Sequence, residues 1–251
     1  MMIFSTRLTS LKRLAMVVSV LALATACSSR NRESDLLDRL ANLDKETIFE
    51  QAEALYADKD YVKARDLFGF VYDTFPNDPL GHKAALRVAD TYSVKNDITN
   101  LTEARLRYRD FANRYPNDPD RDYALLMVGH TYSARKLRPD RDLSDIEEAL
   151  SAYRQLITLY PDSRYVADAE AKVQGLVELL AEHELQVADF YRRNRYYVGA
   201  LWRLEYLVEN YPNYSQIELV NTQLNDLKTL IEERDAAWKK QLEQLKKDAE
   251  D

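Results

Sequence analysis

The sequence predicts an all-α protein built as an array of helix pairs, and three observations carry this prediction. First, the chain holds only five glycines and seven prolines in 251 residues, which leaves little material for turns between strands. Second, four of the prolines share one setting, with an aromatic residue before and Asn or Asp after each of them. Third, an alanine stands twelve residues before each of these four prolines, as expected of an internal repeat.

The helix expected before each proline carries one apolar stripe. The prolines are Pro76, Pro116, Pro161 and Pro212, and the alanines are Ala64, Ala104, Ala149 and Ala200. Large apolar residues stand eight and five residues before the prolines: Phe68, Tyr108, Tyr153 and Leu204, then Val71, Phe111, Leu156 and Leu207. Offsets of 12, 8 and 5 lie on one side of a helix. Each helix should end before its proline, because proline donates no backbone hydrogen bond and disfavours helical geometry at the preceding residue.

A second helix is expected in front of each of these, marked by a small residue followed three positions later by a large one. The pairs are Ala52/Leu55, Ala89/Tyr92, Gly129/Tyr132 and Ala188/Tyr191. Twelve residues separate the small residue from the next alanine in the first and fourth units, which is what two antiparallel helices with a short turn need. This pattern resembles the tetratricopeptide repeat. The alternative is a generic helical bundle whose helices end at prolines.

One stretch departs from the repeat. Residues 165–194 contain no proline and keep apolar residues at intervals of three and four, which predicts a single helix of about 30 residues. From Ile217 onward the helical spacing continues, as a fifth pair or a capping helix. The predicted fold is therefore a tetratricopeptide-repeat α-solenoid of about five helix pairs, with one long helix between the third and fourth repeats.

The first 26 residues have the features of a secretory signal peptide. They contain three cations, no acid and an apolar run too short to span a bilayer. The only cysteine of the chain, Cys27, follows at once in ATACSSR, which resembles the lipobox of bacterial lipoproteins. The resemblance implies cleavage before Cys27, lipid modification of its thiol and, with Ser28 next to it, transit to the outer membrane. The alternative is an ordinary signal peptide with an incidental cysteine.

These features predict the domain organisation. We expect a lipoprotein signal peptide at 1–26, a lipidated cysteine and tether at 27–44, the repeat array at 45–235 and a charged tail at 236–251. The formal charge is −7, and removal of the signal peptide makes it more negative by three. An acidic protein lacks the basic surface that binding to phosphates requires, so we do not expect nucleic acid as a partner.

No set of residues predicts catalysis. His183-Glu184 begins like a zinc-protease helix, but Val187 stands where the second histidine would be required. The acidic run at 117–122 lacks the glycine and the bidentate glutamate of a calcium loop. No glycine-rich phosphate loop and no nucleophile elbow are present. We therefore predict no enzyme activity, no cofactor and no metal.

The segment YRRNRYYVGALWR at 191–203 is the candidate binding surface. Arginines alternate there with aromatic residues, and these residue types are enriched at the centres of protein interfaces. A solvated helix end is the alternative, above all for Arg192 and Arg193. The predicted partner-binding residues are Arg195, Tyr197, Trp202 and Arg203.

Three segments carry a closer resemblance. Residues 183–213, with 122–133 and 140–169, resemble the BamD family of outer-membrane lipoproteins that assemble β-barrels, and the resemblance covers about 45–215. Two departures leave the first groove, between the N-terminal repeats, less well defined: FPNDPLGHK at 75–83 lacks the aromatic and the glycine that the family usually has after the first proline stop, and three extra residues stand near Ile98.

The resemblance implies a lipid-anchored protein of the outer membrane that faces the periplasm. Its C-terminal half would dock the POTRA domains of the barrel insertase BamA, with Arg203 in contact with them. The alternative for Arg203 is an ion pair within the protein, with Glu205 or with a neighbouring helix. Its N-terminal groove would receive unfolded outer-membrane precursors, and other lipoproteins of the same machine would be further partners. The alternative is another periplasmic tetratricopeptide lipoprotein that coordinates cell-wall synthesis or pilus assembly, because a fold alone does not decide the partner.

Overall fold

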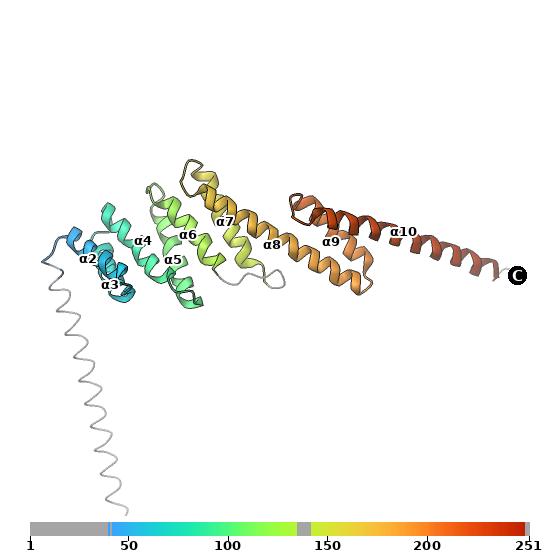
Figure 1. The fold of residues 1–251 in the computed structure, drawn as a ribbon, viewed down its shortest axis with the longest axis horizontal. Coiled ribbons are helices and arrows are strands. Elements are labelled where there is room, and N and C mark those ends of the chain that lie inside the picture. Colours follow the sequence, from blue (N-terminus) through green and yellow to red (C-terminus); the bar gives the residue numbers. More distant parts are fainter. Residues whose placement is uncertain (1–39, 41, 135–141, 249–251) are drawn as a thin grey trace, which may run out of the picture. The chain divides into compact units, whose positions relative to one another are not determined.

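The computed structural model describes residues 40, 42–134 and 142–248, and these residues contain nine α-helices and no strand (Figure 1). The helices are α2 (Lys45–Ala57), α3 (Tyr61–Thr74), α4 (Pro79–Ser93), α5 (Ile98–Arg114), α6 (Arg121–Ser133), α7 (Ser144–Leu159), α8 (Val166–Arg193), α9 (Tyr197–Asn210) and α10 (Ile217–Asp248). The all-α prediction is confirmed. The predicted signal peptide and Cys27 lie outside the described residues.

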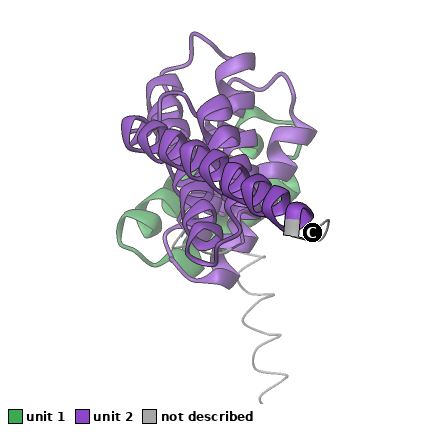
Figure 2. Ribbon diagram, turned by 90° about the vertical axis from the view of Figure 1, so that its right-hand side faces the viewer, with its two compact units in different colours: residues 1–84 green, residues 85–251 purple. Residues whose placement is uncertain are grey.

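The chain divides into two compact units, residues 1–84 and 85–251 (Figure 2). In the first unit, α2 packs on α3, and the ring of Phe49 meets the ring of Phe68 edge to face, with centroids 5.2 Å apart. The side chain of Asp44 caps α2 by accepting the N–H of Thr47 at 2.7 Å. An ion pair between Lys45 and Asp78 joins the start of α2 to the turn after α3.

In the second unit the helices pack one after another along the chain. Contacts join α5 to α6, α6 to α7, α7 to α8, α8 to α9 and α9 to α10. Such nearest-neighbour packing is typical of a solenoid, in which each repeat buries its apolar face against the next. The described helices form four consecutive pairs, from α2/α3 to α8/α9, followed by the single helix α10.

The predicted long helix is present as α8, which has 28 residues. Its first half, with Ala169 and Leu176, belongs to a core shared with α5, α6 and α7. Its second half, with Ala181, Leu185 and Ala188, belongs to a separate core shared with α9 and α10. The helix therefore connects the third and fourth repeats as predicted.

The small residues predicted at the helix crossings are buried. All four repeat alanines, Ala64, Ala104, Ala149 and Ala200, are 0% exposed. At the α6–α7 crossing a Cβ atom on Gly129 would lie 2.4 Å from the ring of Tyr153, so no side chain fits there. The small residues let neighbouring helices approach closely enough for the aromatic residues beside them to be enclosed.

The prolines end the helices in the predicted way. Helices α3, α5, α7 and α9 each end two residues before a proline. The aromatic residue between helix and proline leaves the helical region, with φ between −119° and −132°. Its N–H still donates to the carbonyl four residues earlier, so one further bond closes the last turn. These capping residues are Phe75, Tyr115, Tyr160 and Tyr211.

The three extra residues near Ile98 form the first turn of α5, which has 17 residues where α3 and α9 have 14. Asp97 caps this turn, because its carboxylate accepts the N–H of Asn100 at 3.0 Å. The insertion therefore lengthens one helix at its N-terminal end and leaves the crossing at Ala104 in place.

A buried carboxylate links three helices of the second unit. Asp90 of α4 accepts hydrogen bonds from the hydroxyls of Tyr108 and Tyr123 at 2.6 and 2.8 Å, and from Arg87 at 2.9 Å. Burial, then the charge of Asp90, raises the pKa of Tyr108, so its hydroxyl stays a donor. Because every member of the cluster has a partner, it holds α4, α5 and α6 in one arrangement.

Gly129→Ala tests whether the close approach of α6 and α7 requires a residue without a side chain at this position. The new methyl group would displace the Tyr153 ring, and such overpacking costs about 1–3 kcal/mol of unfolding free energy. Gly175→Ala in α8 is the matched control, since nothing lies within 4 Å of its Cβ position and alanine favours a helix interior by about 0.5–1 kcal/mol. Urea unfolding followed by circular dichroism should move the two midpoints in opposite directions, and a stabilised Gly129→Ala protein would contradict the packing argument.

Candidate protein-binding surface

The turn between α8 and α9 carries the predicted binding residue Arg195. This residue has φ of 64°, a left-handed conformation that favours glycine. The N–H of Tyr196 donates to the carbonyl of Tyr191 at 2.9 Å, which closes the helix end in a Schellman-type turn. Lys59 occupies the same position in the turn between α2 and α3, also with φ of 64°. The repeat geometry thus places a long cationic side chain at a position where glycine would be less strained.

A row of exposed apolar side chains runs along the outer side of α9. Val198 and Trp202 are 72% and 74% exposed, and Tyr206 follows four residues later, also exposed. The buried stripe of this helix, from Ala200 to Leu207, lies on the opposite side, because residues two apart on a helix point about 200° apart. We call Val198, Trp202 and Tyr206 the outer row. Exposed apolar clusters of this kind mark interaction sites.

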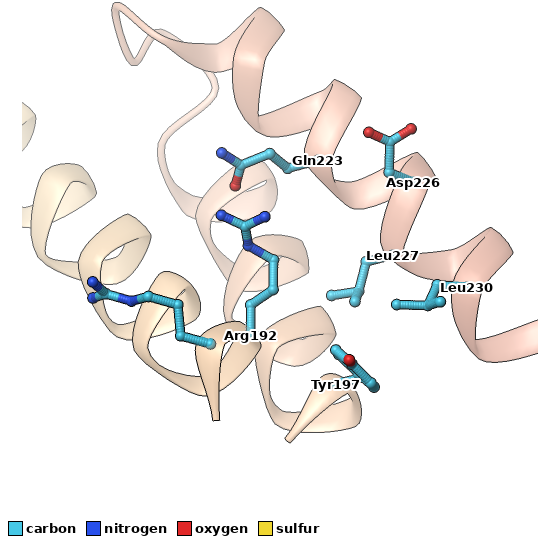
Figure 3. A pocket seen from close by; sticks show the side chains of 7 residues that line it. Arg192, Tyr197, Gln223, Asp226, Leu227 and Leu230 are labelled. Atoms are coloured by element: carbon cyan, nitrogen blue, oxygen red, sulfur yellow. The ribbon is translucent and has the colours of Figure 1, made fainter. Parts of the chain in front are cut away.

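Tyr197 occupies a different place from Trp202. Its ring is partly buried and packs under Arg234 of α10, whose guanidinium carbon lies 5.0 Å from the ring centroid. A hollow of about 370 Å³ opens beside it, between the end of α8 and α10 (Figure 3). It is lined by Arg192, Arg193, Tyr197, Gln223, Asp226, Leu227 and Leu230. Tyr197 therefore joins α9 to α10 and also forms a wall of this hollow.

A second hollow, of about 340 Å³, lies where α10 passes the turn between α8 and α9. Arg195 and Tyr197 line it together with Ile231 and Arg234. Two of the four predicted binding residues therefore share this hollow, while Trp202 lies in the outer row.

Arg203 is paired with the nearly buried carboxylate of Glu184. Its Nη1 donates to the Glu184 carboxylate at 2.9 Å, and this bond between α9 and α8 raises the pKa of Arg203. Glu184 is only 8% exposed, whereas the Arg203 side chain keeps 36% of its surface exposed. The neighbouring Glu205 pairs instead with Lys228 of α10, at 3.0 Å. Arg203 thus has a structural partner already, and contact with another protein stays a prediction.

Sequence reasoning missed three contributors to this surface. Val198 and Tyr206 could have been found from their spacing of four around Trp202, on the side of α9 opposite the repeat alanine. Glu184 could not have been found as the partner of Arg203, because the two are 19 residues apart on different helices. Only the crossing of α8 and α9 brings them together.

A third hollow, of about 150 Å³, lies among α5, α6 and α7. Its walls combine polar groups, such as Arg109, Asn113 and Gln155, with apolar residues from α6. A surface of this mixed kind can meet both the backbone and the side chains of an extended peptide.

Within residues 40, 42–134 and 142–248, no three side chains among His, Cys, Asp and Glu come close enough to hold a metal ion. Among the helices of this same part of the chain, none combines the length and the apolar character needed to cross a bilayer.

The family model of the outer membrane lipoprotein YfiO matches residues 41–242. The chain belongs to this family. The outer membrane protein assembly factor BamD of Neisseria gonorrhoeae is 24% identical over 215 residues, which cover 83% of this chain and 80% of that protein. BamD of Vibrio cholerae serotype O1 is 36% identical over 76 residues, 30% of this chain and 32% of that protein. The predicted membership of the YfiO/BamD family is confirmed.

Among solved structures, a thermophilic tetratricopeptide protein of Thermus thermophilus matches with a TM-score of 0.39 and 18% identity, over 74% of this chain and 100% of that one. The helix pairs, buried alanines and proline-ended helices described above carry the repeat assignment for this member of the family.

Arg203→Ala should destabilise the array. The substitution leaves the buried Glu184 carboxylate without its cation, and an unsatisfied buried polar group costs about 1–3 kcal/mol. Lys228→Ala is the matched control, because it removes the exposed partner of Glu205 and should cost under about 1 kcal/mol. Adding Glu184→Gln to Arg203→Ala should recover part of the loss in denaturant unfolding. Additive effects of the two substitutions would show that the pair is uncoupled.

Proposed function

We propose that this protein is a scaffold of the outer-membrane β-barrel assembly machine, which docks the POTRA domains of BamA and receives unfolded outer-membrane precursors. Membership of the YfiO/BamD family and the assembly-factor names of its relatives support the general role. The observation that carries the docking proposal is the outer row of α9, three large apolar residues exposed beside the Arg203–Glu184 pair.

The outer row suits a folded protein partner. Trp202 offers a large apolar surface with one N–H donor, and aromatic residues of this type dominate binding energy at interface centres. Arg203 adds a guanidinium that is already oriented by Glu184, so less side-chain entropy is lost when a partner carboxylate approaches it. A docking surface of rigid aromatic and arginine side chains on packed helices fits an assembly scaffold.

The proposed membrane attachment completes this role. We propose that the segment 1–26 is removed, that Cys27 carries the lipid, and that residues 27–44 connect it to a repeat array at 45–235 that faces the periplasm. The family match to an outer membrane lipoprotein supports this location.

For the precursors we propose the grooves of the N-terminal repeats. The hollow among α5, α6 and α7 supports this, because the exposed amides of Asn113 and Gln155 can pair with backbone groups, while the nearly buried Leu125 and Val128 form an apolar floor. An unfolded barrel strand presents both kinds of group. The scaffold would hold it without chemistry, in agreement with the lack of predicted catalytic residues.

Trp202→Ala should weaken binding of the BamA POTRA domains by at least about tenfold, as expected when a central aromatic is removed. The helical spectrum should not change, because Trp202 is 74% exposed. The matched control is Leu106→Ala, an exposed apolar residue on α5.

Arg195→Gly is a second probe of the same surface. Glycine relieves the left-handed backbone strain at this position, so any loss of affinity for the POTRA domains is due to the missing side chain. Lys59→Gly, at the same position in the turn between α2 and α3, is its control. Calorimetry that gives equal affinities for all four variants would exclude this surface.

Cys27→Ser should abolish lipid attachment, because a hydroxyl does not replace the thiol as acceptor in lipoprotein maturation. We expect an unprocessed or mislocalised protein when cell envelopes are fractionated by density. Ser29→Ala, two residues away, is the control and should leave the fractionation unchanged. Recovery of the serine variant in the outer-membrane fraction at the level of the parent would contradict the lipid anchor.

A further inference from the structure

The last helix continues the apolar face of the array beyond the point where another helix covers it. Val220 and Leu227 of α10 are buried in the core shared with α8 and α9, and Ile231 packs against that core. Further along the same helix Trp238, Leu242 and Leu245 are 59%, 39% and 62% exposed. We call these three residues the terminal stripe.

The terminal stripe lies in register with the buried face. Leu224, Ile231, Trp238 and Leu245 follow one another at intervals of seven residues, which is close to two helical turns. Helix α10 runs from Ile217 to Asp248 without a break, and it extends past α9 in Figure 1. The side of α10 that packs on α9 in its first half is therefore the side left uncovered by the described residues in its second half.

The charge of α10 changes sign along its length. From 226 to 235 the helix carries four acidic and two basic residues, whereas from 236 to its end at Asp248 it carries four lysines and two acidic residues. Lys239 and Lys246 each follow a stripe residue directly, so they border the stripe on one edge. The second half of α10 is thus an amphipathic helix with a net positive charge in an otherwise acidic protein, a pattern typical of helices that lie on membrane surfaces.

A second copy of the chain fits the terminal stripe poorly. Two α10 helices packed antiparallel through Leu242 would bring Lys239 of one copy near Lys246 of the other, and like charges at such flanking positions repel. The stripe is also short, because three residues over two turns are fewer than the three to four heptads of a stable coiled coil. An apolar stripe bordered by lysines is complementary to a surface that is apolar inside and anionic at its rim.

We propose that the second half of α10 binds the surface of an anionic phospholipid membrane. The terminal stripe would enter the boundary between headgroups and acyl chains, with the Trp238 ring at headgroup depth, while Lys239 and Lys246 pair with lipid phosphates. Such a short helix binds weakly alone and contributes as a second contact beside a lipid anchor, which raises its local concentration at the membrane. The proposal rests on the membrane location proposed above and does not depend on docking of BamA.

Tryptophan fluorescence tests this contact. The chain has two tryptophans, so the Trp202→Phe variant makes Trp238 the only reporter. The processed protein, purified from cell envelopes, is reconstituted into vesicles of phosphatidylcholine with or without phosphatidylglycerol. With the anionic lipid we expect Trp238 emission to shift to shorter wavelength and to be quenched by brominated acyl chains. The shift should be lost at high salt, which screens the lysines.

Matched variants test whether the shift of Trp238 emission depends on the terminal stripe and its lysines. Leu245→Gln, and Lys239→Gln with Lys246→Gln, should each lose most of the shift, whereas Leu106→Gln, also exposed but on α5, should keep it. Identical emission with and without anionic lipid would overturn the proposal. A shift that depends on protein concentration without vesicles would indicate a second copy, and one that requires an added envelope protein would indicate a protein partner; either result overturns it.

Flotation of the same vesicles reports anchoring separately. If the protein floats with neutral vesicles but the Trp238 emission does not shift with either lipid, the lipid anchor is retained. That outcome overturns only the proposed membrane contact of α10. Protein that floats with neither kind of vesicle overturns both. Failure of BamA binding, measured without vesicles, bears on the docking proposal alone.

Discussion

The close approach of neighbouring helices at small residues is the constraint on which the rest of this structure depends. Four buried alanines and Gly129 bring helix backbones together, so the large side chains eight residues before each proline are fully enclosed. Tyr108 and Tyr153 are buried in this way despite their hydroxyls, which find Asp90 and Ser133 as partners. The small residues set the distance between neighbouring helices, and this distance brings the polar groups of adjacent helices within hydrogen-bonding range.

Helix α8 links the repeat packing to the candidate binding surface on α9. Because it spans both cores of the second unit, its C-terminal half is rigidly placed, and it presents Glu184 to Arg203 on α9. A nearly buried carboxylate is costly without a cation, so the pair couples the position of a candidate binding residue to the stability of the fold. The outer row of α9 is not coupled to the stability of the fold in this way. Its residues are exposed, contribute little to the core and are available for contact with another protein.

Several elements were predictable because they depend on local chemistry. Proline cannot extend a helix, so Pro76, Pro116, Pro161 and Pro212 located four helix ends within two residues. Apolar spacing without a proline predicted the length of α8 to within a few residues. The three residues inserted near Ile98 were recognised as an insertion, but only the structure shows that they lengthen α5.

The sequence by itself determined the helices, their buried faces, the small residues at their crossings and the family, since each of these follows from residue types at fixed spacing along one chain. The tertiary structure alone decided which charges meet: Arg203 pairs with Glu184 and not with its neighbour Glu205, which turns to Lys228. It also decided that the apolar face of α10 is covered as far as Ile231 and exposed at Trp238. The reason is that a periodic pattern shows which side of a helix is apolar, whereas the lengths and crossings of its neighbours decide how much of that side is buried.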